Sequence, residues 1–382
     1  MKEIYLDHAA TAPLKKEVLA EMMPYLTTEY GNPSAIYRSA QRAKSAISRA
    51  REQVAKVISA KADEIYFTSG GTEADNWVLK ASFEAFGKEK PHIITSAIEH
   101  HAVLETCHYL EEKGAEITYI SPEKNGSISP EKIREAITDN TCLISIMSAN
   151  NETGIIEPIR EIGRIAHENG IYFHTDAVQA YGHISIDISE NFIDFLSISA
   201  HKIGGPKGVG ALFIKKGIPV KSFIHGGMQE RARRAGTENV AGIVGFGKAA
   251  EIAGNEMEEA SVSLIRKRDY LVKRILTEIP DTSLNGEGER LPGHINIAYH
   301  GLDGESLLIY LDMHGIACSA GSACASGSLS PSHVLTAMGM SYEDAHASIR
   351  MSLSDENTTE ELDEVLEILK EGCLRLRNGG GF

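Results

Sequence analysis

Cysteine is scarce in this sequence, and long apolar runs are missing. The five cysteines, Cys107, Cys142, Cys318, Cys324 and Cys373, form no CxxC pair. An odd number without paired spacing indicates neither a disulfide framework nor a zinc site. No stretch approaches the roughly 18 consecutive apolar residues of a transmembrane helix, and the N-terminus has no signal-peptide core. We therefore expect a cytoplasmic protein without a metal.

A basic patch is also missing. The chain has 53 acidic and 38 basic residues, a net charge of −15, and the acidic residues are scattered along it. This balance argues against nucleic acid and anionic membranes as partners. The chain has 382 residues, and 42% of them are hydrophobic. Because this length exceeds that of a domain with one typical core, we predict two globular domains.

Short apolar segments alternate with amphipathic segments through the first two thirds of the chain. This alternation is typical of an α/β fold with a mainly parallel sheet that helices cover on both faces. The predicted strands are Glu64–Thr68, Ile93–Ser96, Glu116–Ile120, Leu143–Met147, Tyr172–Thr175, Phe195–Ser199 and Ala211–Ile214.

The pattern changes near residue 254. A long helix is predicted over 256–278, followed by short strands and a C-terminal helix that a capping box at Thr358 begins. We therefore predict a large domain over 14–254. A smaller α+β domain is predicted to comprise residues 1–13 and 255–382.

One strand leads into a segment rich in glycine and proline. The apolar run Phe195–Ile198 places Lys202 at a strand end, where sites lie in α/β folds. A lysine partly shielded from water there can act as an amine nucleophile or a base. The alternative is a surface loop lysine, a description that suits the neighbouring Lys207 better.

Polar residues follow three other predicted strands. Thr68–Glu73 begins a helix, so its N–H groups and the Thr72 hydroxyl can hold a phosphate, although a plain helix cap is the alternative. Asp176 needs a partner, either a ring-nitrogen cation or a structural hydrogen bond. His100 and His101 follow the strand at 93–96 and can equally be ordinary capping or solvated residues.

A lysine amine, an acid, a phosphate cradle and an imidazole at the strand ends of one sheet are what pyridoxal 5'-phosphate requires. The chain also resembles the cysteine desulfurases of the NifS/IscS type, which are fold-type I pyridoxal phosphate enzymes of the class V aminotransferase family. The matching motifs are Tyr5–Thr11, Tyr30–Ser34, Thr72–Asn76, Glu99–His100, Asn150–Gly154, Asp176–Gln179, Ser199–Lys202, Arg234–Asn239, Gly321–Cys324 and Ile349–Leu353.

The resemblance implies a role for each residue of the cofactor site. Lys202 would bind the cofactor covalently, Asp176 would pair with its pyridine nitrogen, and Gln179 would donate a hydrogen bond to its phenolic oxygen. His100 would stack on the ring and move protons. The implied phosphate ligands are Gly71, Thr72, Ser199 and His201.

The resemblance also implies a homodimer and a site for L-cysteine. Thr237 of the partner subunit would join the phosphate ligands. The implied substrate-binding residues are Asn151, Arg350 and Asn32, with Asn151 and Arg350 on the carboxylate. Arginine suits this role because its planar fork meets a carboxylate with two hydrogen bonds.

Cys324 separates this family from other enzymes of the same fold. It lies in a run of small residues within a loop of about residues 318–330, where a thiol can reach a cofactor and leave again. An exposed cysteine on a linker is the alternative. By the resemblance, Cys324 takes the sulfur of L-cysteine as a persulfide, L-alanine leaves, and an iron–sulfur scaffold or a tRNA-thiolation enzyme accepts the sulfur.

The other cysteines have simpler interpretations. Cys318 is expected to pack at a strand end, with a disulfide to Cys324 under oxidation as a side hypothesis, and the remaining three are expected in the core. An aminotransferase or selenocysteine lyase on the same fold would keep Lys202 and Asp176 without needing Cys324 as a nucleophile. A cofactor-binding scaffold subunit without turnover is a further alternative.

Overall fold

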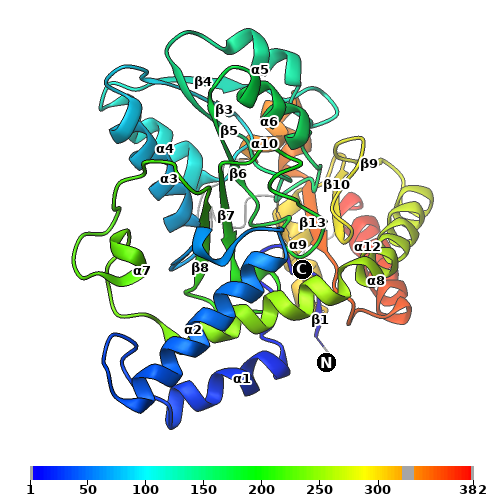
Figure 1. Ribbon diagram of the computed structural model, residues 1–382. Helices are drawn as coiled ribbons and strands as arrows, with labels where there is room; N and C mark the ends of the chain where they lie inside the picture. The colour runs from blue at the N-terminus through cyan, green and yellow to red at the C-terminus, as the bar shows by residue number, and fades with distance from the viewer. Residues whose placement is uncertain (1–2, 321–330, 380–382) are drawn as a thin grey trace.

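Three β-sheets organise the chain (Figure 1). The structure, a computed structural model, describes residues 3–320 and 331–379. No helix in these two ranges has the length and apolar character needed to cross a bilayer. The helices are α1 (Lys16–Thr27), α2 (Arg38–Lys56), α3 (Gly71–Phe86), α4 (His101–Glu111), α5 (Pro130–Ala136), α6 (Ile159–Glu168), α7 (Gln229–Ala232), α8 (Val240–Glu278), α9 (Gly304–Met313), α10 (His333–Ala337), α11 (Tyr342–His346) and α12 (Thr359–Arg377), with 3₁₀ turns η1 (Ala62–Glu64) and η2 (Ala200–Lys202).

The largest sheet has seven strands in the order β2-β8-β7-β6-β5-β3-β4. β8 pairs antiparallel with both of its neighbours, and the other pairs are parallel. Six carboxyl ends therefore lie at one edge, and the predicted seven-stranded, mainly parallel sheet is confirmed. Its strands are β2 (Ile65–Thr68), β3 (His92–Ser96), β4 (Glu116–Ile120), β5 (Thr141–Ser145), β6 (Tyr172–Asp176), β7 (Phe195–Ser199) and β8 (Gly210–Ile214).

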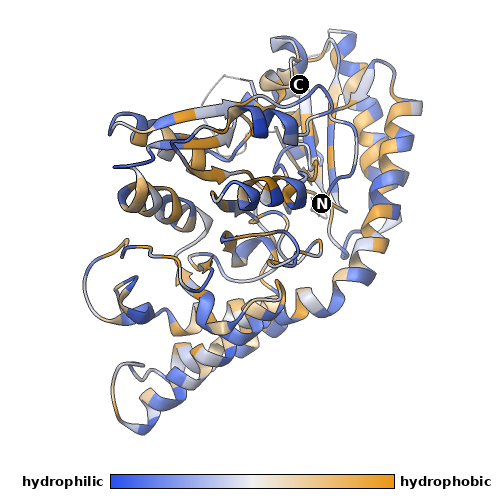
Figure 2. Ribbon diagram, turned by 45° about the horizontal axis from the view of Figure 1, so that its top comes forward, coloured by the Kyte–Doolittle hydropathy of each residue, from blue (hydrophilic) through white to orange (hydrophobic). Residues whose placement is uncertain are grey.

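Side chains of this sheet enter two hydrophobic cores. On β8, Ala211 and Phe213 face a core shared with α1, α2, α6 and α8, whereas Leu212 and Ile214 face a core shared with α3 and α4. Successive strand residues point to opposite faces, so apolar residues at every position are buried on both sides. The covering helices carry hydrophilic residues on their outer faces (Figure 2).

A second layer packs beside the large sheet. Its antiparallel sheet has the order β12-β13-β10-β9, and α9, α12 and the C-terminal part of α8 share its core. The N-terminal strand β1 pairs with β11, and Asp7 continues this segment with a bridge to Ser352 of β13. The strands are β1 (Ile4–Tyr5), β9 (Thr282–Leu284), β10 (His294–Tyr299), β11 (Ile316–Ala317), β12 (Ser319–Ala320) and β13 (Ser348–Ser352).

Two predicted boundaries were wrong. The helix expected from Glu256 begins at Val240, where the Asn239 side chain caps it by accepting from the Gly242 N–H. Apart from Lys248, residues 241–250 are small or apolar and buried, so they show no amphipathic stripe. The strand expected at 143–147 is shifted to β5. The polar Thr141 can be buried there because its hydroxyl oxygen accepts the Thr138 N–H at 2.9 Å and lies 2.8 Å from His92 Nδ1.

The predicted domain division at 254/255 falls inside the continuous helix α8 and stays a prediction. The capping box at Thr358 is confirmed, since the Thr358 and Glu361 side chains each accept the other's backbone N–H.

Candidate active site

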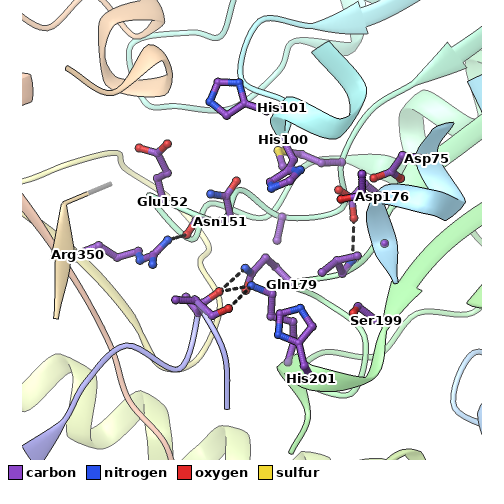
Figure 3. A pocket seen from close by; sticks show the side chains of 18 of the residues that line it. Asp75, His100, His101, Asn151, Glu152, Asp176, Gln179, Ser199, His201 and Arg350 are labelled. Atoms are coloured by element: carbon purple, nitrogen blue, oxygen red, sulfur yellow. Dashed lines mark hydrogen bonds between the residues drawn. The ribbon is translucent and has the colours of Figure 1, made fainter. Parts of the chain in front are cut away.

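A cavity of about 320 Å³ lies at the carboxyl-terminal edge of the large sheet. The ends of β6 and β7, the first turns of α3 and α4, and β13 all contribute to its wall (Figure 3). Ten residues with predicted roles line it together: Gly71, Thr72, His100, Asn151, Asp176, Gln179, Ser199, His201, Lys202 and Arg350. Sites in open α/β sheets form at this edge.

Three residues with predicted roles are not among those lining the cavity. Thr237 is exposed and lines a separate hollow beside Arg234. Asn32 is exposed, and its side-chain oxygen accepts a hydrogen bond from the Ser34 N–H at 3.0 Å. Cys324 lies outside the described residues. The roles of these three residues stay predictions.

Lys202 points at the N-terminal segment of the chain. It ends η2 directly after β7, and its Nζ donates to the carbonyl of Ala9 at 2.5 Å and to that of Ala10 at 2.9 Å. The Gln179 side-chain amide also donates to the Ala9 carbonyl, at 2.9 Å. The amine is therefore held inside the cavity wall by backbone acceptors, in a position to react with a bound carbonyl compound.

Asp176 is a buried carboxylate with spare hydrogen-bonding capacity. One oxygen accepts the Val178 N–H at 2.9 Å. Burial raises the pKa of Asp176 to about 6, although the Val178 N–H and the Lys202 charge act against this. Beside it, burial and the Asp176 charge raise the pKa of Asp75 well above its usual range. Two adjoining buried carboxyl groups favour a bound cation, such as a protonated ring nitrogen.

His100 caps helix α4. Its Nδ1 accepts the Ala102 N–H at 3.1 Å, so the neutral imidazole carries its proton on Nε2. Burial, followed by the charges of Lys202 and His101, lowers the pKa of His100 to about 4. The ring is therefore neutral near pH 7 and presents a flat face for stacking.

The first turn of α3 presents backbone N–H groups that suit an anion. Its N-cap, Gly70, offers no side-chain oxygen, so the first N–H groups of the helix are left for another acceptor. A Cβ atom at Gly71 would lie 2.5 Å from Val178 Cγ2, so a larger residue there would have to displace the Val178 side chain. Ser199 lies beside this turn, since a Cβ atom at Gly70 would be 4.0 Å from Ser199 Oγ, and His201 lines the same cavity (Figure 3). Burial lowers the pKa of His201 to about 4.

Arg350 supplies a buried positive charge on β13. Its Nη1 donates to the Asn151 carbonyl at 3.0 Å, and its Nη2 pairs with Asp7 at 2.8 Å. A guanidinium at this position suits a ligand carboxylate. Together, the amine, the buried acids, the first turn of α3 and the arginine fit pyridoxal phosphate carrying an amino-acid substrate.

Nine further residues line the cavity without a role that the sequence predicted: Ala9, Ala10, Asp75, His101, Met147, Ala149, Glu152, Val178 and His333. Glu152 is buried and accepts from the hydroxyl of Ser332, the residue that caps α10. His333 lies within hydrogen-bonding distance of the Glu99 carbonyl, at 3.0 Å. The sequence could not specify that the Ala9 and Ala10 carbonyls contact Lys202.

The fold and site define a class of proteins, and comparison with known proteins agrees with it. Residues 4–365 match the family model described as "Aminotransferase class-V". The chain therefore belongs to the class-V aminotransferase family. It has 53% identity over 378 residues to "Cysteine desulfurase IscS" of Methanosarcina thermophila, spanning 99% of this chain and 93% of that protein. "Cysteine desulfurase" of Trichormus azollae is 47% identical, spanning 99% and 94%.

Solved structures give the same result. A structure titled "NIFS-LIKE PROTEIN" superposes with a TM-score of 0.91 at 38% identity, covering 97% of this chain and 98% of that one. The NifS-like protein from Rickettsia africae gives 0.88 at 34% identity, covering 97% and 99%. Within its family the chain belongs to the cysteine desulfurases, and its cofactor is pyridoxal 5'-phosphate.

Coenzyme affinity should depend on pH through Asp176. Its pKa of about 6 means that the carboxyl group is ionised above pH 6 and protonated below it, when it can no longer pair with a ring cation. The dissociation constant should therefore rise by up to about tenfold per pH unit below pH 6 and stay level above it. Absorbance titration of the coenzyme-free protein between pH 5 and 8 measures this.

An Asp176→Asn variant is the matched control for that measurement. The coenzyme's phosphate titrates near pH 6 as well, and the variant reports this contribution alone. A wild-type pH profile with the same slope as that of the variant would contradict the role of Asp176.

Proposed function

We propose that this protein converts L-cysteine to L-alanine and holds the released sulfur on Cys324 as a persulfide. The sulfur then passes to an acceptor protein, such as an iron–sulfur scaffold or a tRNA-thiolation enzyme. The observation that carries the proposal is the shared cavity of Lys202, Asp176, His100 and Arg350 in a chain with cysteine desulfurase relatives. A cytoplasmic location is part of this proposal.

Several residues would hold and orient the substrate. The turn at Gly71 and Thr72, with Ser199 and His201, takes the coenzyme phosphate, and Asp176 holds a proton at the ring nitrogen. Arg350 takes the substrate carboxylate beside Asn151. The bound coenzyme supplies a ring that withdraws electrons from the substrate's α-carbon. Because these contacts are made by different elements around one rigid sheet edge, the reacting atoms are fixed relative to Lys202.

Proton transfers fall to Lys202 and His100. Lys202 would be the base that removes the α-proton of the substrate, because its Nζ is the amine that the cavity wall presents. The Ala9 and Ala10 carbonyls then accept hydrogen bonds from the protonated amine, as they do from the amine in the structure. His100, neutral at pH 7, exchanges a proton through Nε2.

Sulfur transfer would be a displacement at the substrate sulfur. The Cys324 thiolate attacks this sulfur, an S–S bond forms, and the substrate's Cβ–S bond breaks with its electron pair left on carbon. Protons complete L-alanine, so one L-cysteine and one thiol give one L-alanine and one persulfide. No external oxidant is needed.

A homodimer is part of the same proposal. Large apolar side chains are exposed on α1 and in the segment that follows it, including Met23 (45%), Leu26 (58%), Tyr30 (84%) and Ile36 (95%). Exposed apolar residues gathered in this way mark a protein interface. Thr237 does not line the cavity of its own chain, which agrees with the proposed position of Thr237 of the partner subunit at the phosphate.

Two measurements on one purified sample test the proposed function. Light scattering should give twice the chain mass of 41.5 kDa. With L-cysteine and dithiothreitol, the same fractions should form sulfide and L-alanine in equal amounts. Amino-group transfer without sulfide would indicate an aminotransferase instead, turnover of L-selenocysteine alone would indicate a lyase, and no turnover of any substrate would indicate a scaffold subunit.

A further inference from the structure

The guanidinium of Arg350 is already occupied by groups of this chain. Its side chain is 3% exposed. Nη2 donates to Asp7 Oδ1 at 2.8 Å and to Ser319 Oγ at 2.9 Å, and Nη1 donates to the Asn151 carbonyl at 3.0 Å. Nε is buried and has no hydrogen-bond partner within residues 3–320 and 331–379.

These contacts block both forks of the guanidinium. A carboxylate binds arginine with two hydrogen bonds either through Nε and Nη2 or through Nη1 and Nη2, so each fork uses Nη2. Both protons of Nη2 are given to Asp7 and Ser319. One proton of Nη1 remains for a ligand in the cavity. A carboxylate can gain the second hydrogen bond only if Asp7 or Ser319 releases Nη2.

The position of Asp7 favours competition with a ligand. Arg350 and Asn151 line the cavity, whereas Asp7 and Ser319 are not among the residues that do. Asp7 Oδ1 also accepts from the Ser319 hydroxyl at 3.0 Å, which helps to hold the Asp7 carboxylate against the guanidinium. The Asp7 charge thus neutralises Arg350, and a ligand carboxylate meets an ion pair instead of an isolated cation.

We propose that Asp7 is a specificity-determining positioning residue that competes with the substrate carboxylate for Arg350. It keeps carboxylate ligands weakly held, so that the amino-acid product leaves the site. This inference rests on the proposed function, which assigns the substrate carboxylate to Arg350.

The test uses the coenzyme-loaded enzyme and two probes without an amino group. 3-Mercaptopropionate carries the carboxylate, and 3-mercaptopropionamide is its neutral counterpart. In Asp7→Asn, the neutral amide is a weaker acceptor for Nη2 than the carboxylate, so the carboxylate probe can displace it and should bind roughly tenfold more tightly, the effect of one hydrogen bond between charged groups. The amide should bind as it does to the wild type. Calorimetry gives both dissociation constants.

Three further variants keep the result decisive. Asp7→Ala should also lower the dissociation constant of 3-mercaptopropionate relative to that of 3-mercaptopropionamide. This second variant tests the inference even if Asp7→Asn fails to fold. Ser319→Ala removes a neutral partner of Nη2 and should raise the affinity for 3-mercaptopropionate by less than the Asp7 variants do. Arg350→Gln should remove the preference for the carboxylate probe.

Two results would overturn the inference: equal or weaker binding of 3-mercaptopropionate in both Asp7 variants, or an unchanged preference in Arg350→Gln. Either can occur while the wild-type enzyme still forms sulfide from L-cysteine. Failure of the proposed function differs, because the wild type then forms no sulfide.

Discussion

Replacement of Lys202 with alanine is expected to abolish the visible absorption band of the covalently held coenzyme and to lower turnover of L-cysteine by about 10³-fold or more. The Lys202 amine both attaches the coenzyme and removes the α-proton. Among the described residues, no other amine lines the cavity. An absorption spectrum and a sulfide assay on the purified variant measure both losses.

Lys207→Ala is the matched control for that experiment. Lys207 lies on the same glycine-rich segment but is exposed and does not line the cavity. Its replacement should leave the spectrum and the turnover unchanged. A Lys202→Ala protein that keeps the band, or a Lys207→Ala protein that loses it, would show that the wrong amine has been assigned.

The second large effect is expected at Cys324. Serine at this position should reduce both L-alanine and sulfide formation by about 10³-fold or more, because an alcohol cannot accept sulfur as a persulfide. The visible band should persist, because coenzyme attachment depends on Lys202. The two variants therefore fail in different ways, one in the spectrum and one in turnover alone.

Cys318→Ser provides the comparison for Cys324. Cys318 lies between β11 and β12, and burial raises the pKa of its thiol to about 12. At neutral pH it is almost entirely the unreactive thiol, since the thiolate is the nucleophile. The Cys318→Ser enzyme should desulfurate L-cysteine normally. Loss of activity in this variant together with normal activity in Cys324→Ser would reverse the assignment.

Much of the fold and the centre of the site could be predicted from the sequence. Strands buried on both faces appear as continuous apolar runs, and the predicted Phe195–Ser199 has the bounds that β7 shows. Parallel strands bring their carboxyl ends to one edge, so His100, Asp176 and Lys202 were expected to meet although they are far apart in the chain. The cavity confirms that they lie together.

Contacts between remote segments could not be predicted. The Ala9 carbonyl accepts a hydrogen bond from Lys202, and Asp7 pairs with Arg350. Both contacts form because β1 pairs with β11 and the segment after β1 runs beside β13. Neither Ala9 nor Asp7 belongs to a periodic pattern, so local sequence gives no sign of its partner. Asp75 illustrates the same limit, since only the packing of α3 on the sheet places its carboxyl group beside Asp176.

The central claim is that a cysteine of this chain carries the sulfur removed from L-cysteine. Mass spectrometry of the coenzyme-loaded protein, after incubation with L-cysteine and without reductant, tests it most directly. We expect the added mass of one sulfur atom on the peptide that bears Cys324, removable by dithiothreitol. Formation of L-alanine and sulfide with that peptide unmodified, or with the sulfur on another cysteine, would contradict it.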